Sequence, residues 1–170
     1  MMQLRIGVVG VIAAFVAVSL SLSAQAAEKK KLSGSSVHKS ILSRTIVNPE
    51  DDPNHIVTSA VWLDSDTSED SDFKGAEHFG YGYSDYVAGS GPDMGYTQMT
   101  LKNGEKIYGK FEGTTKRITK EGEAGESLLE GKWIWKGGTG KFKNINGTLT
   151  YKGKATPEGV SYAWEGEIEY

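Results

Sequence analysis

Apolar and polar side chains alternate residue by residue along most of this chain, and residues 159–170 show the alternation most clearly. In that segment one set of alternate positions is apolar or small, comprising Val160, Tyr162, Trp164, Gly166, Ile168 and Tyr170, and the intervening set includes Glu165, Glu167 and Glu169. Successive side chains of a strand point to opposite faces, so a register shift of one residue would bury three carboxylates. The pattern therefore predicts a β-strand whose apolar set faces inward.

The same alternation recurs from residue 55 onward, with turn residues between the segments. The predicted strands span residues 55–62, 76–89, 96–113 (a hairpin with Asn103-Gly104 at its tip), 115–122, 126–137, 147–155 and 159–170, with a short one at 41–47. Sequential antiparallel strands joined by short turns favour an all-β, eight-stranded up-and-down barrel, because closure removes the free edges of a sheet. A β-sandwich is the structural alternative.

Glycine recurs inside the predicted strands, at Gly80, Gly82, Gly109, Gly131 and Gly153. Glycine within a strand is typical of bends and bulges, which a small barrel needs in order to close. We therefore expect these glycines to lie where the strands bend.

Residues 1–26 have the three regions of a secretory signal peptide. Arg5 precedes an apolar run over residues 6–22, and Ala24-Gln25-Ala26 supplies small residues for cleavage after Ala26. The alternative is a membrane anchor, since a span needs roughly 20 apolar residues. We expect an exported protein, periplasmic or secreted, without stable membrane insertion after cleavage. Residues 27–54 are polar and predict a flexible leader before a single domain at residues 55–170.

Composition narrows the function classes. The chain has no cysteine, which excludes disulfides, thiol catalysis and cysteine-ligated metals. Its net charge of −3 and the lack of a long basic block argue against a nucleic-acid partner. The domain must therefore be stabilised by packing alone.

Candidate catalytic and metal-binding residues are few. The acidic residues of segment 64–72 lack the glycine and glutamate positions of an EF-hand, so a solvated loop is expected there. The three histidines have no zinc-site spacing, and His78 is expected to be exposed, opposite Tyr81 and Tyr83. Asp85 shares the face of those tyrosines and is a weak candidate for proton transfer if that face is inward. We expect no metal site and no cofactor.

The segment "KGGTGKF" at residues 136–142 looks at first like a phosphate-binding loop. A Walker-type loop needs an earlier glycine, a Ser or Thr after Gly140-Lys141, and a following helix, and this sequence provides none of them. The segment, with Gly147 and Tyr151 after it, instead resembles a signature of plant dirigent proteins and of bacterial relatives of the allene oxide cyclase barrel. That resemblance covers about 129–155 well and 76–170 in strand order.

The resemblance implies an eight-stranded barrel in which Gly137–Phe142 forms a corner between two strands. It also implies, if the protein is an enzyme, a cofactor-free cyclase or isomerase, or a guide that folds a reactive substrate inside the barrel. The missing cysteine departs from the plant cyclase pattern, so the sequence favours a binding protein over an enzyme.

Aromatic residues on the strands are the candidate ligand-binding set. The set consists of Tyr81, Tyr83, Phe111, Trp133, Trp135, Tyr151, Tyr162 and Trp164. Such rings either fill the interior of a small barrel or line a cavity for one small hydrophobic or aromatic molecule. Three functions follow as hypotheses: a carrier of such a molecule, a cofactor-free enzyme or guide, and an interaction module that uses the outer surface. The sequence leaves the oligomeric state open.

Overall fold

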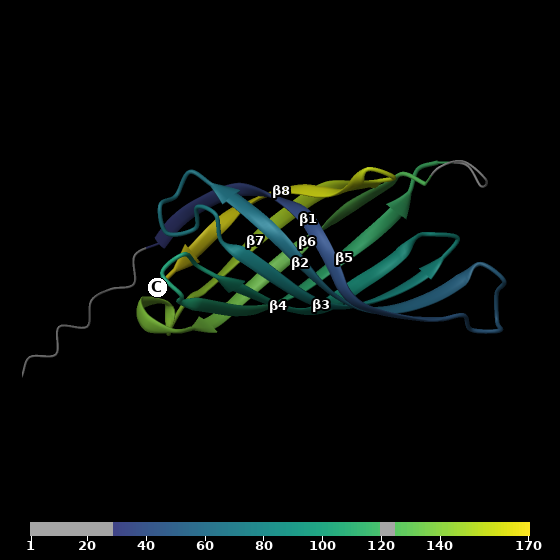
Figure 1. Ribbon diagram of the computed structural model, residues 1–170, viewed down its shortest axis with the longest axis horizontal. Helices are drawn as coiled ribbons and strands as arrows, with labels where there is room; N and C mark the ends of the chain where they lie inside the picture. The colour runs from purple at the N-terminus through teal and green to yellow at the C-terminus, as the bar shows by residue number, and fades with distance from the viewer. Residues whose placement is uncertain (1–28, 120–124) are drawn as a thin grey trace, which may run out of the picture.

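The structure, a computed structural model, describes residues 29–119 and 125–170. They form a closed antiparallel barrel in which each strand pairs with the next and β8 pairs with β1 (Figure 1). Its elements are β1 (Lys29–Val47), β2 (His55–Ser68), β3 (Glu77–Val87), β4 (Gly91–Thr100), β5 (Lys106–Arg117), β6 (Ser127–Gly138), the 3₁₀ turn η1 (Gly140–Phe142), β7 (Asn146–Thr156) and β8 (Gly159–Glu169). The predicted eight-stranded barrel is confirmed. The predicted signal peptide lies outside the described residues, and within them no helix is long and apolar enough to cross a membrane.

The prediction of a flexible leader over residues 27–54 is wrong for most of that stretch. Residues Lys29–Val47 form the 19-residue strand β1, which pairs with β8 through residues 29–37 and with β2 through residues 34–47. Only the short strand expected at 41–47 anticipated it. After the buried Leu32, the inward positions of β1 are small or polar, at Gly34, Ser36 and His38, so the alternation of apolar and polar residues is weak there.

Strand β2 continues through half of the stretch predicted as an acidic loop. It ends at Ser68 rather than near Trp62, and Asp64 and Asp66 occupy inward positions where they are fully buried. Residues 69–76 make the loop to β3. The expected solvated loop is therefore wrong for these two aspartates, whose side chains lie inside the barrel.

The register of β8 is as predicted, since Trp164 and Ile168 are buried while Glu165 and Glu167 are exposed. The hairpin at residues 96–113 is also confirmed: β4 and β5 pair across a tight turn that contains Gly104. Gly104 has φ of +86°, in the left-handed region that glycine adopts without strain.

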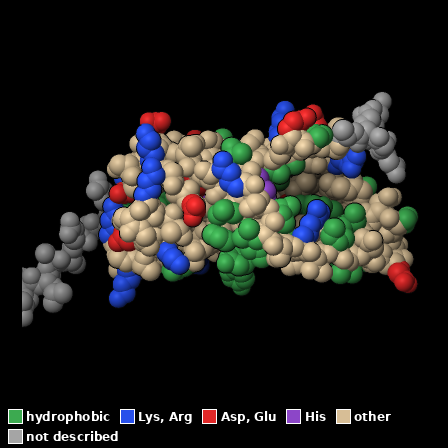
Figure 2. Space-filling model, viewed as in Figure 1, with side chains coloured by type: hydrophobic (Ala, Val, Ile, Leu, Met, Phe, Trp, Pro, Cys, Tyr) green, Lys and Arg blue, Asp and Glu red, His purple; other side chains and the backbone are tan. Residues whose placement is uncertain are grey.

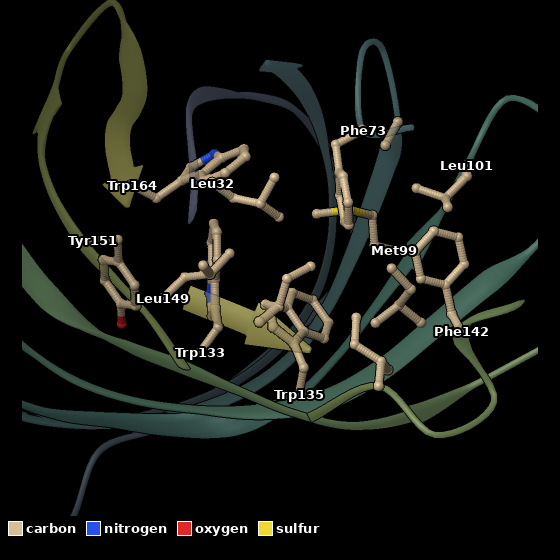
Figure 3. Close-up of a cluster of buried hydrophobic side chains, with 14 of the residues drawn as sticks. Leu32, Phe73, Met99, Leu101, Trp133, Trp135, Phe142, Leu149, Tyr151 and Trp164 are labelled. Carbon is tan, nitrogen blue, oxygen red and sulfur yellow. The ribbon is translucent and has the colours of Figure 1, made fainter. Parts of the chain in front are cut away.

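One end of the barrel is closed by apolar side chains. Phe73, Leu101, Phe142 and Ile145 come from the connections β2–β3, β4–β5 and β6–β7 and are buried there (Figure 3). Phe142 belongs to η1, and its ring contacts those of Phe73 and Tyr170 at centroid distances of 5.7 and 4.6 Å. Gly137–Phe142 thus forms the expected corner between β6 and β7, and the same corner plugs the barrel.

The other end carries the connections β1–β2, β3–β4, β5–β6 and β7–β8. The space-filling view shows the molecule hollowed at this end, with hydrophobic and basic side chains on the walls (Figure 2). We call it the open end. The interior between the open end and the apolar plug holds the candidate site.

Candidate functional site

Six of the eight predicted aromatic residues point into the barrel. They are Phe111, Trp133, Trp135, Tyr151, Tyr162 and Trp164. Trp133 lies at the centre, with ring centroids 5.4 Å from Tyr151, 5.7 Å from Tyr162 and 6.0 Å from Trp164. Figure 3 shows Trp133, Tyr151 and Trp164 converging from β6, β7 and β8. The sequence therefore predicted the kind of side chain that fills this layer and most of its members.

Trp62 on β2 is an interior aromatic residue that the sequence analysis did not include. Its indole lies across Gly80 and Gly82 of β3, where a Cβ atom at either glycine would overlap the ring. The same relation joins Gly34 with Trp164, and Gly113 and Gly131 with Tyr151. These glycines make room for rings from neighbouring strands. The expectation that Gly80, Gly82 and Gly131 mark bends missed this role.

The inward placement of Tyr81, Tyr83 and Asp85 is wrong. Tyr81 and Tyr83 are 47% and 42% exposed on the outer face of β3, and Asp85 shares that face. The Asp85 carboxylate lies 2.8 Å from Nε2 of His55, outside the barrel. The alternation of β3 is genuine, but glycine and histidine occupy its inner face because Trp62 and Trp133 fill the space. Asp85 is therefore no longer a candidate for chemistry in the interior.

The outer tyrosines belong to an exposed apolar patch on β3, β4 and β5. Tyr81 pairs with Tyr96, which is 72% exposed, and Tyr83 pairs with Met94. Tyr108 on β5 lies opposite Gln98 in the same region. We call this set the outer tyrosine patch, and Tyr81 and Tyr83 are part of it rather than of the interior wall.

A polar cluster lies in the middle of the barrel, beside the aromatic layer. We call it the interior polar cluster, and it comprises Ser36, His38, Asp64, Asp66, His78, Thr97 and Tyr162, with the indole N–H groups of Trp62 and Trp164. The sequence analysis had expected His78 to be exposed and Asp64 and Asp66 to be solvated. All three are buried.

Asp64 occupies the side of the cluster toward the open end, because β2 runs from the open end to the closed end. Its Oδ2 accepts hydrogen bonds from the Tyr162 hydroxyl and from Nε1 of Trp62, the latter at 3.2 Å. Nδ1 of His38 lies 2.7 Å from the other oxygen, Oδ1. The His38 side chain is 21% exposed and its ring stacks on Trp62. His38 is thus partly exposed, as are Trp62 and Tyr162 of the same group, whereas Asp64 is buried.

Asp66 lies one inward position deeper. It accepts a hydrogen bond from Ser36, whose hydroxyl in turn accepts one from Nε1 of Trp164 at 3.1 Å. Nδ1 of His78 lies 3.5 Å from Oδ2 of Asp66, and Nε2 of His78 contacts the Thr97 hydroxyl. The His78 ring also packs edge-on against Trp133, with centroids 4.6 Å apart. Asp66 and His78 are therefore held rigidly within the core.

The two carboxylates perturb the groups around them. Burial lowers the pKa of His78, but the charges of Asp66 and Asp64 outweigh burial and hold that pKa above its usual value. Burial, reinforced by the charge of Asp64, raises the pKa of Tyr162 well above its usual value. Tyr162 therefore stays protonated and donates to Asp64 throughout the physiological range.

Three buried atoms of the cluster have no hydrogen-bond partner among the described residues. They are Oδ1 of Asp64, Oδ2 of Asp66 and Nδ1 of His78. Each has an ion-pair contact without hydrogen-bond geometry: Nδ1 of His38 lies 2.7 Å from Asp64 Oδ1, and Nδ1 of His78 lies 3.5 Å from Asp66 Oδ2. Buried polar atoms nearly always make a hydrogen bond. The cluster thus has unused capacity for hydrogen bonding.

A second carboxylate, the partly buried Asp93 of β4, lies nearer the open end. Asp93 accepts hydrogen bonds from Thr115 at 2.8 Å and from the Tyr86 hydroxyl. Burial raises the pKa of Asp93, although those two hydrogen bonds oppose the shift. Because both carboxylate oxygens of Asp93 are partnered, this group has less spare capacity than the interior polar cluster.

A groove of about 700 Å³ lies on the outside of the barrel, over parts of β1, β2, β7 and β8. Ser33, Ser35, Thr67, Lys152 and Glu165 are among its lining residues. It is lined largely by hydroxyl and charged side chains, and no member of the interior polar cluster apart from Trp164 borders it. We therefore place the candidate site in the interior rather than in this groove.

The interior residues of β2 that the sequence analysis missed could have been found from the two-residue period of the strand. Trp62, Asp64 and Asp66 are in phase with Thr58 and Ala60, so the period of β2 continues through the acidic stretch. The stretch was expected to be a loop because it is rich in acidic residues, although its two-residue period indicated a strand. Within the described residues, no group of three or more His, Asp or Glu side chains has an arrangement that could hold a metal ion.

Comparisons with known proteins add a likeness of fold. No protein-family profile matches the chain, and no curated protein sequence matches it. Among solved structures, it is similar to a pterocarpan synthase dirigent protein, with 16% sequence identity over 92% of this chain and 97% of that chain and a TM-score of 0.48. The resemblance of the Gly137–Phe142 segment to dirigent proteins and to allene oxide cyclases stays a prediction from the sequence.

Proposed function

We propose that this protein binds one small aromatic or hydrophobic molecule inside its barrel. The observation that carries the proposal is the position of the aromatic layer, which adjoins a polar cluster with unpartnered buried atoms. Ligand sites typically combine apolar walls with a few polar groups that orient the ligand. Trp62, Tyr162 and His38 are only partly buried, so the open end is the proposed entrance.

The test is a titration of the purified protein with N-phenyl-1-naphthylamine, an apolar probe that becomes fluorescent in a dry site. Trp62→Ala should weaken binding by about tenfold, because it removes a large aromatic contact. Tyr96→Ala, on the outer tyrosine patch, is the matched control and should leave the affinity unchanged. No probe binding by the parent protein would contradict the proposal, as would equal effects of the two variants.

Export is part of the proposal and rests on residues 1–26, with their apolar run and their small residues at the cleavage position. Mass spectrometry of the protein from its host's exported fraction would test it. The expected chain begins at Ala27, and a co-purifying small molecule would identify the ligand class. A chain that retains Met1 would contradict cleavage.

A second candidate function is cofactor-free proton transfer, and the arrangement of His38 and Asp64 favours it. A partly exposed imidazole beside a buried carboxylate is a common arrangement for a general base. The ring opening of 5-nitrobenzisoxazole tests this chemistry: the base takes the C3 proton, the N–O bond breaks, and 2-cyano-4-nitrophenolate forms. His38→Gln should abolish any rate above buffer, and a parent protein no faster than buffer would exclude this function for that probe.

The outer tyrosine patch favours the third hypothesis, an interaction module. Exposed tyrosine-rich patches are typical of protein interfaces. Sedimentation of the parent protein and of Tyr96→Lys would separate this function from ligand binding, because the patch and the interior lie on opposite sides of the sheet.

A further inference from the structure

Among the described residues, the carboxylates of the interior polar cluster have no lysine or arginine as an ion-pair partner. The ion-pair partners that the structure shows for Asp64 and Asp66 are the imidazoles of His38 and His78. The charges of Asp66 and Asp64 hold the pKa of His78 above its usual value, and His78 lies beside Asp66, so it offsets charge chiefly there. The groups that donate to Asp64 Oδ2, the Tyr162 hydroxyl and the Trp62 indole, are neutral and leave the charge of Asp64 in place. A bound cation would offset this charge.

The unpartnered atoms show where such a cation would sit. Oδ1 of Asp64 and Oδ2 of Asp66 are buried acceptors that receive no hydrogen bond of good geometry from the described residues. Their nearest basic groups are the imidazoles, with Nδ1 of His38 2.7 Å from Asp64 Oδ1 and Nδ1 of His78 3.5 Å from Asp66 Oδ2. Both aspartates are buried, but Asp64 lies nearer the open end and its neighbour His38 is partly exposed. Ser36 and Trp164 enclose Asp66.

The surroundings of Asp64 select the kind of cation. Trp62 and Tyr162 both donate to its Oδ2 from the edges of their rings, and the His38 ring stacks on the face of Trp62. A cation in the place of His38 would therefore lie over that face. Trp133 packs against Tyr162 behind them, with centroids 5.7 Å apart. Aromatic faces attract cations, and this attraction strengthens when water is excluded. A carboxylate within an aromatic wall suits an organic ammonium group that carries its own ring.

We propose that the barrel binds an aromatic amine in its ammonium form, with the ammonium group at Oδ1 of Asp64 and the ring against Trp62, Trp133 and Tyr162. The inference rests on the proposed ligand-binding function and names the chemical class of the ligand. His38, now 2.7 Å from that oxygen, is the side chain that moves aside or shares the carboxylate when the amine enters.

Three probes of similar size and different charge test the inference: phenethylamine, 2-phenylethanol and 3-phenylpropanoate, each titrated calorimetrically at pH 7.5. The amine should bind at least about tenfold more tightly than the alcohol, because it adds a charged hydrogen bond and cation–π contacts, and the carboxylate should bind most weakly. Asp64→Asn should remove most of the difference between amine and alcohol. Glu130→Gln, an exposed carboxylate on the outer face of β6, is the matched control and should keep it.

The outcomes separate this inference from the function it rests on. If the alcohol binds as tightly as the amine, or if Asp64→Asn keeps the preference, the amine inference is overturned while ligand binding stands. If none of the three probes binds and N-phenyl-1-naphthylamine also fails, both are overturned. Should Asp64→Asn fail to fold, Tyr162→Phe replaces it: removing one donor to Asp64 should raise the ratio of amine to alcohol affinity at least about twofold. An unchanged or lower ratio would count against the inference.

Discussion

At the scale of single residues, the interior is built from pairs of an aromatic side chain and a glycine on a neighbouring strand. Trp62 with Gly80 and Gly82 is the clearest pair. The sequence revealed the aromatic residues of β6, β7 and β8, where they alternate with charged residues. On β3 the sequence led to the wrong face, because Tyr81 and Tyr83 are the larger side chains but Gly80 and Gly82, which alternate with them, face inward. The size of the side chains could not show which face is inward, because Trp62 of the neighbouring strand β2 fills the space over these glycines.

Gly80→Ala tests this pairing. The new methyl group would overlap the Trp62 indole, so we expect a loss of about 1–3 kcal/mol in the free energy of unfolding, together with a change in tryptophan fluorescence. Chemical denaturation monitored by fluorescence measures both. Gly125→Ala is the control: the nearest atom to its added Cβ is 3.7 Å away, an ordinary contact, and its stability should stay within about 0.5 kcal/mol. Equal stabilities of the two variants would contradict the pairing.

At the scale of elements, a strand could be predicted where its two faces differ in composition. In β8 three glutamates mark the outer face, and the register followed directly. In β1 the inner face is Leu32, Gly34, Ser36 and His38, while Val37 lies outside and is half exposed. The alternation of apolar and polar residues in β1 is therefore weak, and in part polar residues face inward while an apolar one faces outward. Such a strand depends on its neighbours, because Trp164 fills the space that Gly34 leaves empty.

Two matched substitutions test whether β1 is an integral strand. Leu32→Ala should lower the free energy of unfolding by about 2–5 kcal/mol, since Leu32 is buried in the core cluster. Val37→Ala, on the outer face of the same strand, should cost less than about 1 kcal/mol. Urea denaturation of both variants gives the comparison. A flexible leader would instead make both substitutions nearly neutral.

At the scale of the whole molecule, the barrel is divided along its axis into an apolar plug, a polar middle with aromatic walls, and a hollowed open end. The aromatic layer could be inferred from sequence, because most of its residues lie at inward positions of predicted strands. The sequence also predicted the Gly137–Phe142 corner, but not the plug, whose apolar residues come from three connections. The polar middle could not be inferred either, since acidic residues near a loop are normally solvated. Asp64 and Asp66 are buried only because distant strands place donors and histidines around them.

Burial of a histidine among carboxylates makes stability depend on pH in a defined direction. The pKa of His78 is raised in the folded state, so its stabilising contribution is complete below about pH 6.5, the usual pKa of histidine. As pH rises further, the unfolded chain loses the proton first and stability falls until the folded state has lost it too. The free energy of unfolding should therefore decrease from about pH 6.5 upward.

His55 also makes the free energy of unfolding decrease as pH rises, because hydrogen bonds to Asp51 and Asp85 raise its pKa. High salt separates the contributions of the two histidines. The Asp51 side chain is two-thirds exposed, so high salt screens the attraction at His55, whereas His78 and Asp66 are buried and are screened much less. The test is to measure the free energy of unfolding between pH 6 and 9 in 1 M NaCl. In the parent protein and in His55→Gln it should still decrease with rising pH, and in His78→Gln it should change little with pH. A slope that survives in His78→Gln under these conditions would mean that the buried pair does not retain its proton in the folded barrel.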